Sequence, residues 1–176
     1  MNSHGYPEGR ARATAPFFVA GGGADGVESY FGVAQFGAVA AELAQAQLWN
    51  PPTSVRVLRV RRMVHLIGAT ASMDLRFYTA ELPTFQLRGL SSRVSPNASR
   101  GELRTWSAAA ALGTKYADVQ TQAFIQGEII DGFQPRLSPG QGIGLSQLTV
   151  NVAIRVLFEW DELPVDAPAP VEPPAS

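Results

Sequence analysis

The segment Leu148–Trp160, with the sequence LTVNVAIRVLFEW, decides the fold class. Every even-numbered position in it is apolar, and the odd-numbered positions hold Thr, Asn, Ala, Arg, Leu and Glu. A period of two is typical of a strand with one buried face, whereas a helix would scatter these side chains around its axis. The segment therefore predicts a long, half-buried strand.

A second long strand is predicted over residues 54–67, where the alternation changes phase. The apolar side chains move from odd-numbered Val55 and Val57 to even-numbered Leu58 and Val60, and later to odd-numbered Met63. One extra residue in a strand shifts the alternation in this way, so we expect a β-bulge here.

Shorter segments complete the prediction of an all-β chain. Alternating or β-branched and aromatic stretches occupy residues 73–78, 85–90 and 119–130. Clusters of turn-forming residues lie between them, at 50–52, 95–97, 131–132 and 138–142. Many strands with this punctuation, and no alternation of strands with helices, predict an antiparallel β-sandwich or jelly roll with extended N- and C-terminal arms.

Two segments carry helical signals. Residues 32–49 are rich in alanine and place apolar side chains at helical spacing, but the second half, Leu43–Trp49, also alternates. Helix and strand both stay open for 32–49, with a strand as the interpretation of 43–49. Residues Ser107–Leu112 could form one helical turn.

The two ends differ from the centre in composition. Residues 1–30 are predicted to be a flexible arm with a glycine-rich loop, residues 31–162 the β-sandwich domain, and residues 163–176 a proline-rich acidic tail. The stretch after Trp160 holds five prolines and four acids, which predicts an extended, solvated chain. Such a tail either keeps the protein in solution or lies as a strap on a neighbouring subunit.

The amino-acid composition limits the classes of partner that we expect. The chain has 176 residues with a net charge of −1, so no overall charge attracts it to nucleic acid or to an anionic membrane, and we expect neither as a partner. Only 16% of the residues are charged, against about 25% in typical proteins, which suits a surface covered by neighbours. There is no cysteine, which excludes disulfides and thiolate metal sites.

Motifs for catalysis are weak. Residues 21–26 match the dinucleotide pattern G-x-G-x-x-G, with Glu42 downstream, but the remaining chain lacks the strand–helix–strand units that this pattern requires. The chain has two histidines, His4 and His65, too few for a three-histidine zinc site, and no G-x-S-x-G motif. His65 is interpreted as a strand residue with a satisfied hydrogen bond. We therefore expect no enzyme and no catalytic, metal or cofactor residues.

Four arginines on the second strand, Arg56, Arg59, Arg61 and Arg62, are candidate interface residues. Residue parity places them on both faces unless a bulge realigns them. They would either contact an acidic neighbour, of which the acidic C-terminus is one candidate, or protect a solvated edge strand. Together with Trp49 they form the predicted protein interface.

Two stretches resemble small virion proteins encoded near the head genes of tailed bacteriophages. The first is Gln47–Val55, QLWNPPTSV, which runs into the arginine-rich strand. The second is Leu137–Leu145, LSPGQGIGL, with the ending Phe158–Glu162, FEWDE. Glycines 140, 142 and 144 in it permit positive φ or close backbone approach.

This resemblance implies a β-sandwich or jelly roll that cements or decorates a capsid. It implies the major capsid protein as partner, a dimeric or trimeric homo-oligomer, and a place on the capsid surface of the virion after synthesis in the host cytoplasm. Neither stretch is catalytic.

The alternative function is a receptor- or glycan-binding module of a tail or head fibre. In that case the aromatic residues Trp106, Tyr116 and Tyr78 would form a shallow platform for a sugar.

Overall fold

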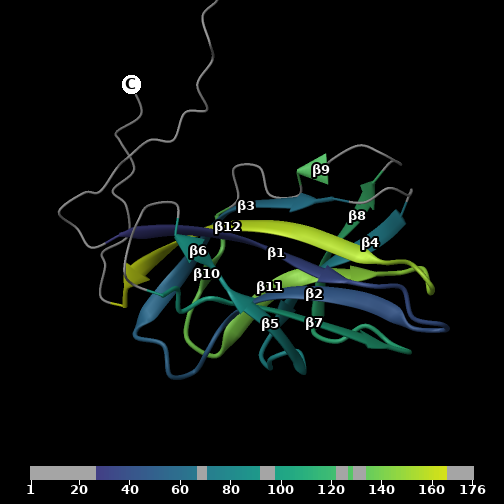
Figure 1. The fold of residues 1–176 in the computed structure, drawn as a ribbon, viewed down its shortest axis with the longest axis horizontal. Coiled ribbons are helices and arrows are strands. Elements are labelled where there is room, and N and C mark those ends of the chain that lie inside the picture. The colour runs from purple at the N-terminus through teal and green to yellow at the C-terminus, as the bar shows by residue number, and fades with distance from the viewer. Residues whose placement is uncertain (1–26, 67–70, 92–97, 122–126, 129–133, 166–176) are drawn as a thin grey trace, which may run out of the picture.

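The computed structural model describes residues 27–66, 71–91, 98–121, 127–128 and 134–165. These residues form no helix, and their strands are β1 (Glu28–Phe36), β2 (Leu43–Asn50), β3 (Arg56–His65), β4 (Ala71–Tyr78), β5 (Thr84–Arg88), β6 (Leu90–Ser91), β7 (Glu102–Ala108), β8 (Thr114–Thr121), β9 (Gly127–Glu128), β10 (Arg136–Leu137), β11 (Gln141–Gln147) and β12 (Ile154–Pro164) (Figure 1). The predicted all-β class is confirmed.

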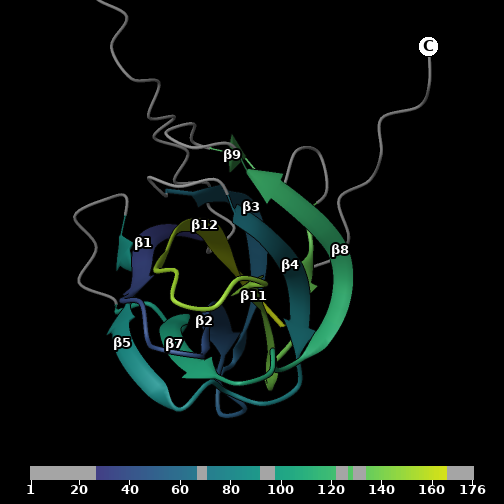
Figure 2. The same cartoon turned by 90° about the vertical axis from the view of Figure 1, so that its right-hand side faces the viewer.

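The strands form two antiparallel sheets packed face to face as a β-sandwich. Sheet A has the order β10-β3-β12-β1-β6, with β9 also paired to β3, and sheet B has the order β5-β7-β2-β11-β4-β8. Figure 2 looks along the strands, with β5 and β8 at the two edges of sheet B. The first and last long strands, β1 and β12, pair along nine residues in the middle of sheet A.

Strand β12 shows why the period-two signal predicts the fold. Its even-numbered side chains, Ile154, Val156, Phe158 and Trp160, are fully buried between the sheets. They alternate with residues on the outer face of sheet A. The predicted buried face is confirmed from residue 154 onward.

The prediction of strand over residues 148–153 is wrong. These residues form the turn that carries the chain from β11 in sheet B to β12 in sheet A. Asn151 has a φ of 63°, and its side-chain oxygen accepts a hydrogen bond of 2.8 Å from the N–H of Ala41. Because this tertiary contact fixes a left-handed backbone, the alternation of Leu148 and Val150 does not continue the strand.

The predicted bulge in β3 is confirmed at the second of the two phase changes, the one before Met63. The first change, between Val57 and Leu58, is no bulge, because both residues pair in regular register with β12. Glu159 of β12 pairs with Arg62, and the next residue, Trp160, pairs with Val60, so Arg61 is the extra residue. The extra residue reverses which face of the sheet the following odd- and even-numbered side chains occupy. Leu58 and Val60 before it, and Met63 and His65 after it, therefore all point into the core.

Both helical alternatives fail. Residues 32–49 comprise the end of β1, a turn and most of β2, so the strand interpretation of Leu43–Trp49 is correct. Ser107 and Ala108 end β7, and the residues up to Gly113, which has a φ of 77°, form a turn. Packing of Ala44 and Ala46 on the inner face outweighs the helix propensity of alanine.

The glycine-rich segment before β11 behaves as predicted. Gly140 has a φ of 82° at the turn. A Cβ atom at Gly142 would lie 2.9 Å from the Gln47 amide nitrogen and from the Trp49 ring. Glycine is required there because these two side chains pack closely against the backbone of β11.

Some predictions fall outside the described residues. These are the arm up to residue 26 with the G-x-G-x-x-G pattern, the tail from residue 166, the turn clusters at 95–97 and 131–132, residue 67 of the predicted strand 54–67, and residues 122–126 and 129–130 of the predicted strand 119–130. Strand β1 begins at Glu28 and β12 ends at Pro164, so the sandwich includes residues on both sides of the predicted boundaries at 30/31 and 162/163.

Candidate functional site

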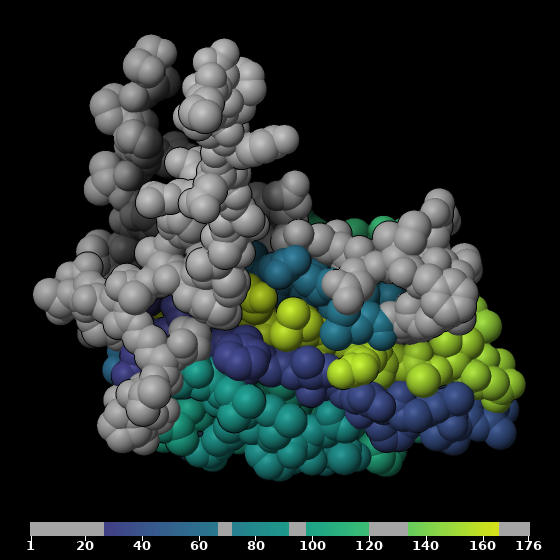
Figure 3. All heavy atoms as spheres, turned by 45° about the horizontal axis from the view of Figure 1, so that its top comes forward, coloured from purple at the N-terminus to yellow at the C-terminus, as the bar shows by residue number. Residues whose placement is uncertain are grey.

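The bulge in β3 brings three of the four candidate arginines onto the outer face of sheet A. Arg59 contacts Asp161 of β12 at 2.5 Å, and Arg61 reaches the other oxygen of Asp161 at 3.6 Å. Arg62 lies 3.4 Å from Glu159. Figure 3 shows β3 beside β12 on this face. The acidic partners of these arginines thus include carboxylates of the adjacent strand of the same chain.

The other two candidates lie elsewhere. Arg56 begins β3 and lines a pocket at one end of the sandwich. The side chain of Trp49 is buried against Tyr78 and Leu82 on the outer face of sheet B. Trp49 therefore has almost no exposed ring surface for a partner.

Amide side chains fasten two connecting segments over the outer face of sheet B. Gln47 donates to the carbonyl of Ala80 at 3.0 Å and accepts from the N–H of Leu82 at 2.8 Å. Gln45 accepts from the N–H of Leu112 at 2.9 Å. Both glutamines are fully buried by this cover. The β4–β5 and β7–β8 connections are thus anchored to β2.

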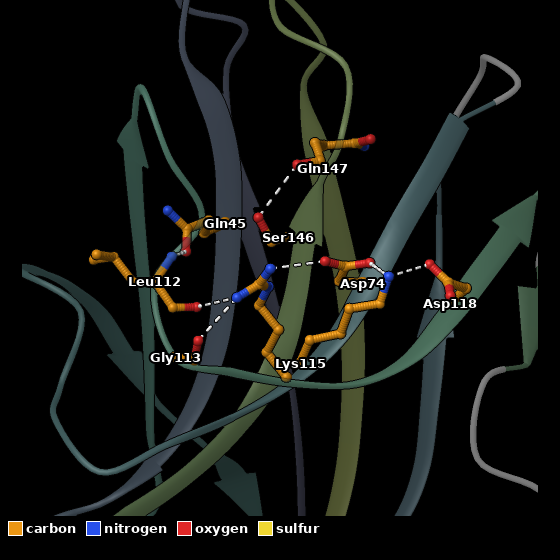
Figure 4. Close-up of polar contacts among 9 residues, drawn as sticks. Gln45, Asp74, Leu112, Gly113, Lys115, Asp118, Ser146 and Gln147 are labelled. Carbon is orange, nitrogen blue, oxygen red and sulfur yellow. Dashed lines mark hydrogen bonds and ion pairs between the residues drawn. The ribbon is translucent and has the colours of Figure 1, made fainter.

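A polar cluster around Asp74 extends this arrangement (Figure 4). Asp74 is buried on β4 and contacts Arg76 at 2.7 Å and Lys115 at 3.1 Å. Lys115 also pairs with Asp118. Burial alone would raise the pKa of Asp74, but the hydrogen bonds from Arg76 and Lys115 outweigh it and hold that pKa below its usual value. The hydrogen bonds to Asp118 and Asp74 raise the pKa of Lys115.

The Asp74 cluster links neighbouring elements of sheet B. Its carboxylate is ionised and shared between two cations, and Arg76 also donates to the carbonyl of Gly113 at 2.8 Å. The nearby Ser146 hydroxyl donates to the carbonyl of Gln147 at 3.2 Å (Figure 4). The contacts of Asp74 and Arg76 tie β4, β8 and the β7–β8 turn together.

His65 differs from its sequence interpretation. It is fully buried, and among the described residues neither ring nitrogen has a hydrogen-bond partner, so the expectation of a satisfied hydrogen bond is wrong. Its position opposite Val156 points it into the core. Burial lowers the pKa of His65 to about 4, because the charged ring would lose its hydration.

This burial predicts acid sensitivity. The unfolded chain binds the His65 proton near pH 6.5 and the folded chain only near pH 4, so the free energy of unfolding falls as pH drops between these values, by on the order of 3 kcal/mol. The contribution is fully present above pH 6.5. Urea unfolding at pH 7 and pH 4.5 should show a smaller difference for His65→Leu than for the wild type. The matched variant His4→Leu should keep the wild-type difference, and equal pH dependence in all three proteins would contradict the assignment.

The aromatic residues proposed for a sugar platform do not share one surface. Tyr78 is buried. Trp106 on β7 and Tyr116 on β8 are exposed, but β2, β11 and β4 lie between their strands. Four strand spacings separate them by roughly 19 Å. Tyr116 packs edge-on against Phe77 instead.

We define the apolar rim as five exposed apolar side chains: Val39, Leu148 and Val150 in the turns at one end of the sandwich, and Trp106 and Leu112 on the outer side of sheet B. Each of these side chains is 36–43% exposed. Their turns are linked: the Asn151 N–H donates to the Glu42 carbonyl at 3.4 Å, and the Ser107 hydroxyl contacts the Glu42 carboxylate. Figure 3 shows the yellow-green β11–β12 turn beside the blue β1–β2 turn at this end.

A pocket lies at the opposite end, in the mouth between the sheets. It has a volume of about 340 Å³ and is lined by Glu28, Val55, Arg56, Arg88, Ala98, Arg100 and Glu162. Glu28 and Glu162 continue the inner-face rows of Tyr30 and Trp160, so the buried face of sheet A becomes polar at its end. We call this site the arginine pocket.

No family model, no characterised protein and no solved structure matches the chain. The described residues contain no group of three or more acids or histidines placed to hold a metal ion. They also contain no helix of the length and hydropathy that a membrane span needs.

Sequence reasoning missed the rim and the arginine pocket. Leu148 and Val150 look like strand residues because their alternation continues into β12. The pocket combines residues from β1, β3, β5, β12 and the segment before β7, and only the topology shows that these meet. The sequence does contain one signal for the pocket. The apolar alternation of β12 breaks at Glu162, an acid two residues after buried Trp160 and on the same face of the strand.

Proposed function

We propose that this protein is a structural virion protein of a tailed phage that binds the capsid surface as cement or decoration and stabilises the shell. The apolar rim is the observation that carries this proposal. Clustered apolar side chains on the surface of a monomer mark contact sites for other proteins. The major capsid protein is the proposed partner, and the proposed role is mechanical, without catalysis.

The sandwich suits such a role because hydrogen bonds fix the turns that carry the rim. The rim turns are joined by the contacts of Asn151 and Glu42, and the Leu112 N–H is bonded to buried Gln45. A preorganised contact surface loses little conformational entropy on binding. The rim therefore provides a rigid apolar contact.

The small size of the rim favours repeated contacts. A stable protein interface buries about 800 Å² on each partner, and five half-exposed side chains supply only part of that area. A homo-dimer or trimer on a capsid symmetry axis would multiply the contact without a larger rim. Because only the assembled shell offers these sites, binding would stabilise the shell by mass action.

A charge on the rim should weaken this binding. We expect Val150→Glu to lower the affinity for particles assembled without this protein by about tenfold or more, because the contact would bury an unpaired carboxylate. Co-sedimentation with such particles measures it. The control is Leu90→Glu, an exposed apolar residue of β6 outside the rim, which should bind like the wild type. Equal binding of both variants would reject the rim as the contact, and no binding of the wild type would reject the proposal itself.

A further inference from the structure

One row of side chains on the outer face of sheet A carries more positive than negative charge. Arg136 of β10 pairs with Arg59 of β3, and Arg59 pairs with Asp161 of β12, so the three lie side by side across three strands. Like charges directly opposite each other on neighbouring strands repel. Arg61, the extra residue of the bulge, joins this row through its contact with Asp161. We call Arg59, Arg61, Arg136 and Asp161 the basic row.

A single carboxylate serves the three arginines of the basic row. Arg59 donates to one oxygen of Asp161 through Nε and Nη2, at 3.2 and 2.5 Å. Arg61 lies 3.6 Å from the other oxygen, which also accepts from the Ser29 hydroxyl at 2.6 Å. Arg136 makes no ion pair with any residue that the structure describes. The row therefore holds three guanidinium groups against one carboxylate.

The two arginines that Asp161 neutralises least are open to solvent. The Arg61 side chain is 54% exposed, and Arg136 is exposed as well. The Asp161 side chain, in contrast, is only 4% exposed. Figure 3 shows β3 and β12 at the surface on this face. A partner that approaches the basic row therefore meets guanidinium groups and almost none of the carboxylate.

We propose that the basic row is a contact site for an acidic protein surface, whose carboxylates pair with Arg61 and Arg136. The forked guanidinium group suits carboxylates, and this pairing would offset the repulsion between Arg136 and Arg59. A nucleic acid fits less well, because its binding depends on neutralising many phosphates, whereas the whole chain has a net charge of −1. The row shares no residue with the rim, so this inference does not depend on capsid binding.

Titration with an acidic peptide tests this contact. The probe is a fluorescein-labelled oligoglutamate at low salt, and fluorescence anisotropy measures its binding to the full-length protein. Arg61→Gln and Arg136→Gln should each raise the dissociation constant about threefold, the effect of losing one exposed ion pair. The double variant should raise it by about tenfold, because each substitution removes a separate pair.

Arg155→Gln is the matched control. Arg155 is an exposed arginine on the same face of β12, and its position in the strand places it roughly 20 Å from Asp161. Its substitution should leave the dissociation constant unchanged. In a second measurement, Arg136→Gln should not lower the urea midpoint, because it removes a repulsion between strands.

Four results would overturn the proposal. The first is no binding of the oligoglutamate to the wild type. The second is an equal loss for Arg155→Gln, because the peptide would then follow total charge. The third is a lower urea midpoint for Arg136→Gln, which would give this arginine a role in the fold instead. The fourth is tighter binding of an oligothymidylate of equal length that the same variants weaken, which would assign the basic row to nucleic acid.

Discussion

Trp160→Ala should lower the free energy of unfolding by about 3–5 kcal/mol, the range for removing a buried large aromatic side chain. Trp160 is fully buried at the centre of β12 and stacks on Tyr30 with ring centroids 6.2 Å apart. The residues that follow β5 and precede β7 are fitted to it: a Cβ atom at Gly89 or Gly101 would lie 2.2 or 2.8 Å from the indole. Alanine would leave a cavity that these neighbours cannot fill.

Urea unfolding at neutral pH measures this loss. The control is Trp106→Ala, because Trp106 is the exposed tryptophan of the rim and its removal leaves no cavity. We expect a change below about 1 kcal/mol for this control. A similar urea midpoint for both variants would show that Trp160 is not the packing centre of the sandwich.

Glu162→Ala should lower the free energy of unfolding by on the order of 3 kcal/mol. The variant would leave the N–H groups of Arg100 and Gly101 and the indole N–H of Trp160 without their acceptor, while the Ser99 hydroxyl would keep the Gly101 carbonyl at 3.1 Å. The Gly101 and Trp160 N–H groups are in buried surroundings, where an unsatisfied donor is most costly. The segment from Ser99 to β7 should lose its fixed position over Trp160.

The matched variant is Glu159→Ala on the same strand. Glu159 is partly exposed and pairs with Arg62 at 3.4 Å, and exposed ion pairs contribute about 0.2–1 kcal/mol. Amide hydrogen exchange should accelerate at Arg100 and Gly101 in the Glu162 variant alone. If Glu159→Ala destabilised the protein as much as Glu162→Ala, the assigned role of the buried carboxylate would be wrong.

The sequence predicts the parts of this fold that depend on local pattern. The alternation in β12 and the phase change in β3 follow from which side chains the sandwich buries, so the buried face and the bulge could both be predicted. The alanine-rich segment is compatible with both helix and strand in the sequence, because its strand conformation depends on the segments that cover Gln45 and Gln47 on the outer face. The covering residues are Leu82, 35 positions after Gln47, and Leu112, 67 positions after Gln45.

The surface sites depend on contacts that pattern does not encode. The arginines of β3 looked like a free interface, and their carboxylate partners on β12 appear only once the two strands are in register. Trp49 looked like an interface aromatic, and the segment at Leu82 covers it. The rim and the arginine pocket are formed by turns and strand ends that are distant in sequence, so the topology had to be known first.

Cryo-electron microscopy of virions that carry this protein tests the central proposal most directly. We expect density for the sandwich at regular sites on the head shell, with the β1–β2 and β11–β12 turns against the major capsid protein. Val39, Leu148 and Val150 would then lie in the contact, and the arginine pocket would face away from the shell. Density at the tail, or on the head with the pocket end against the shell, would contradict the account.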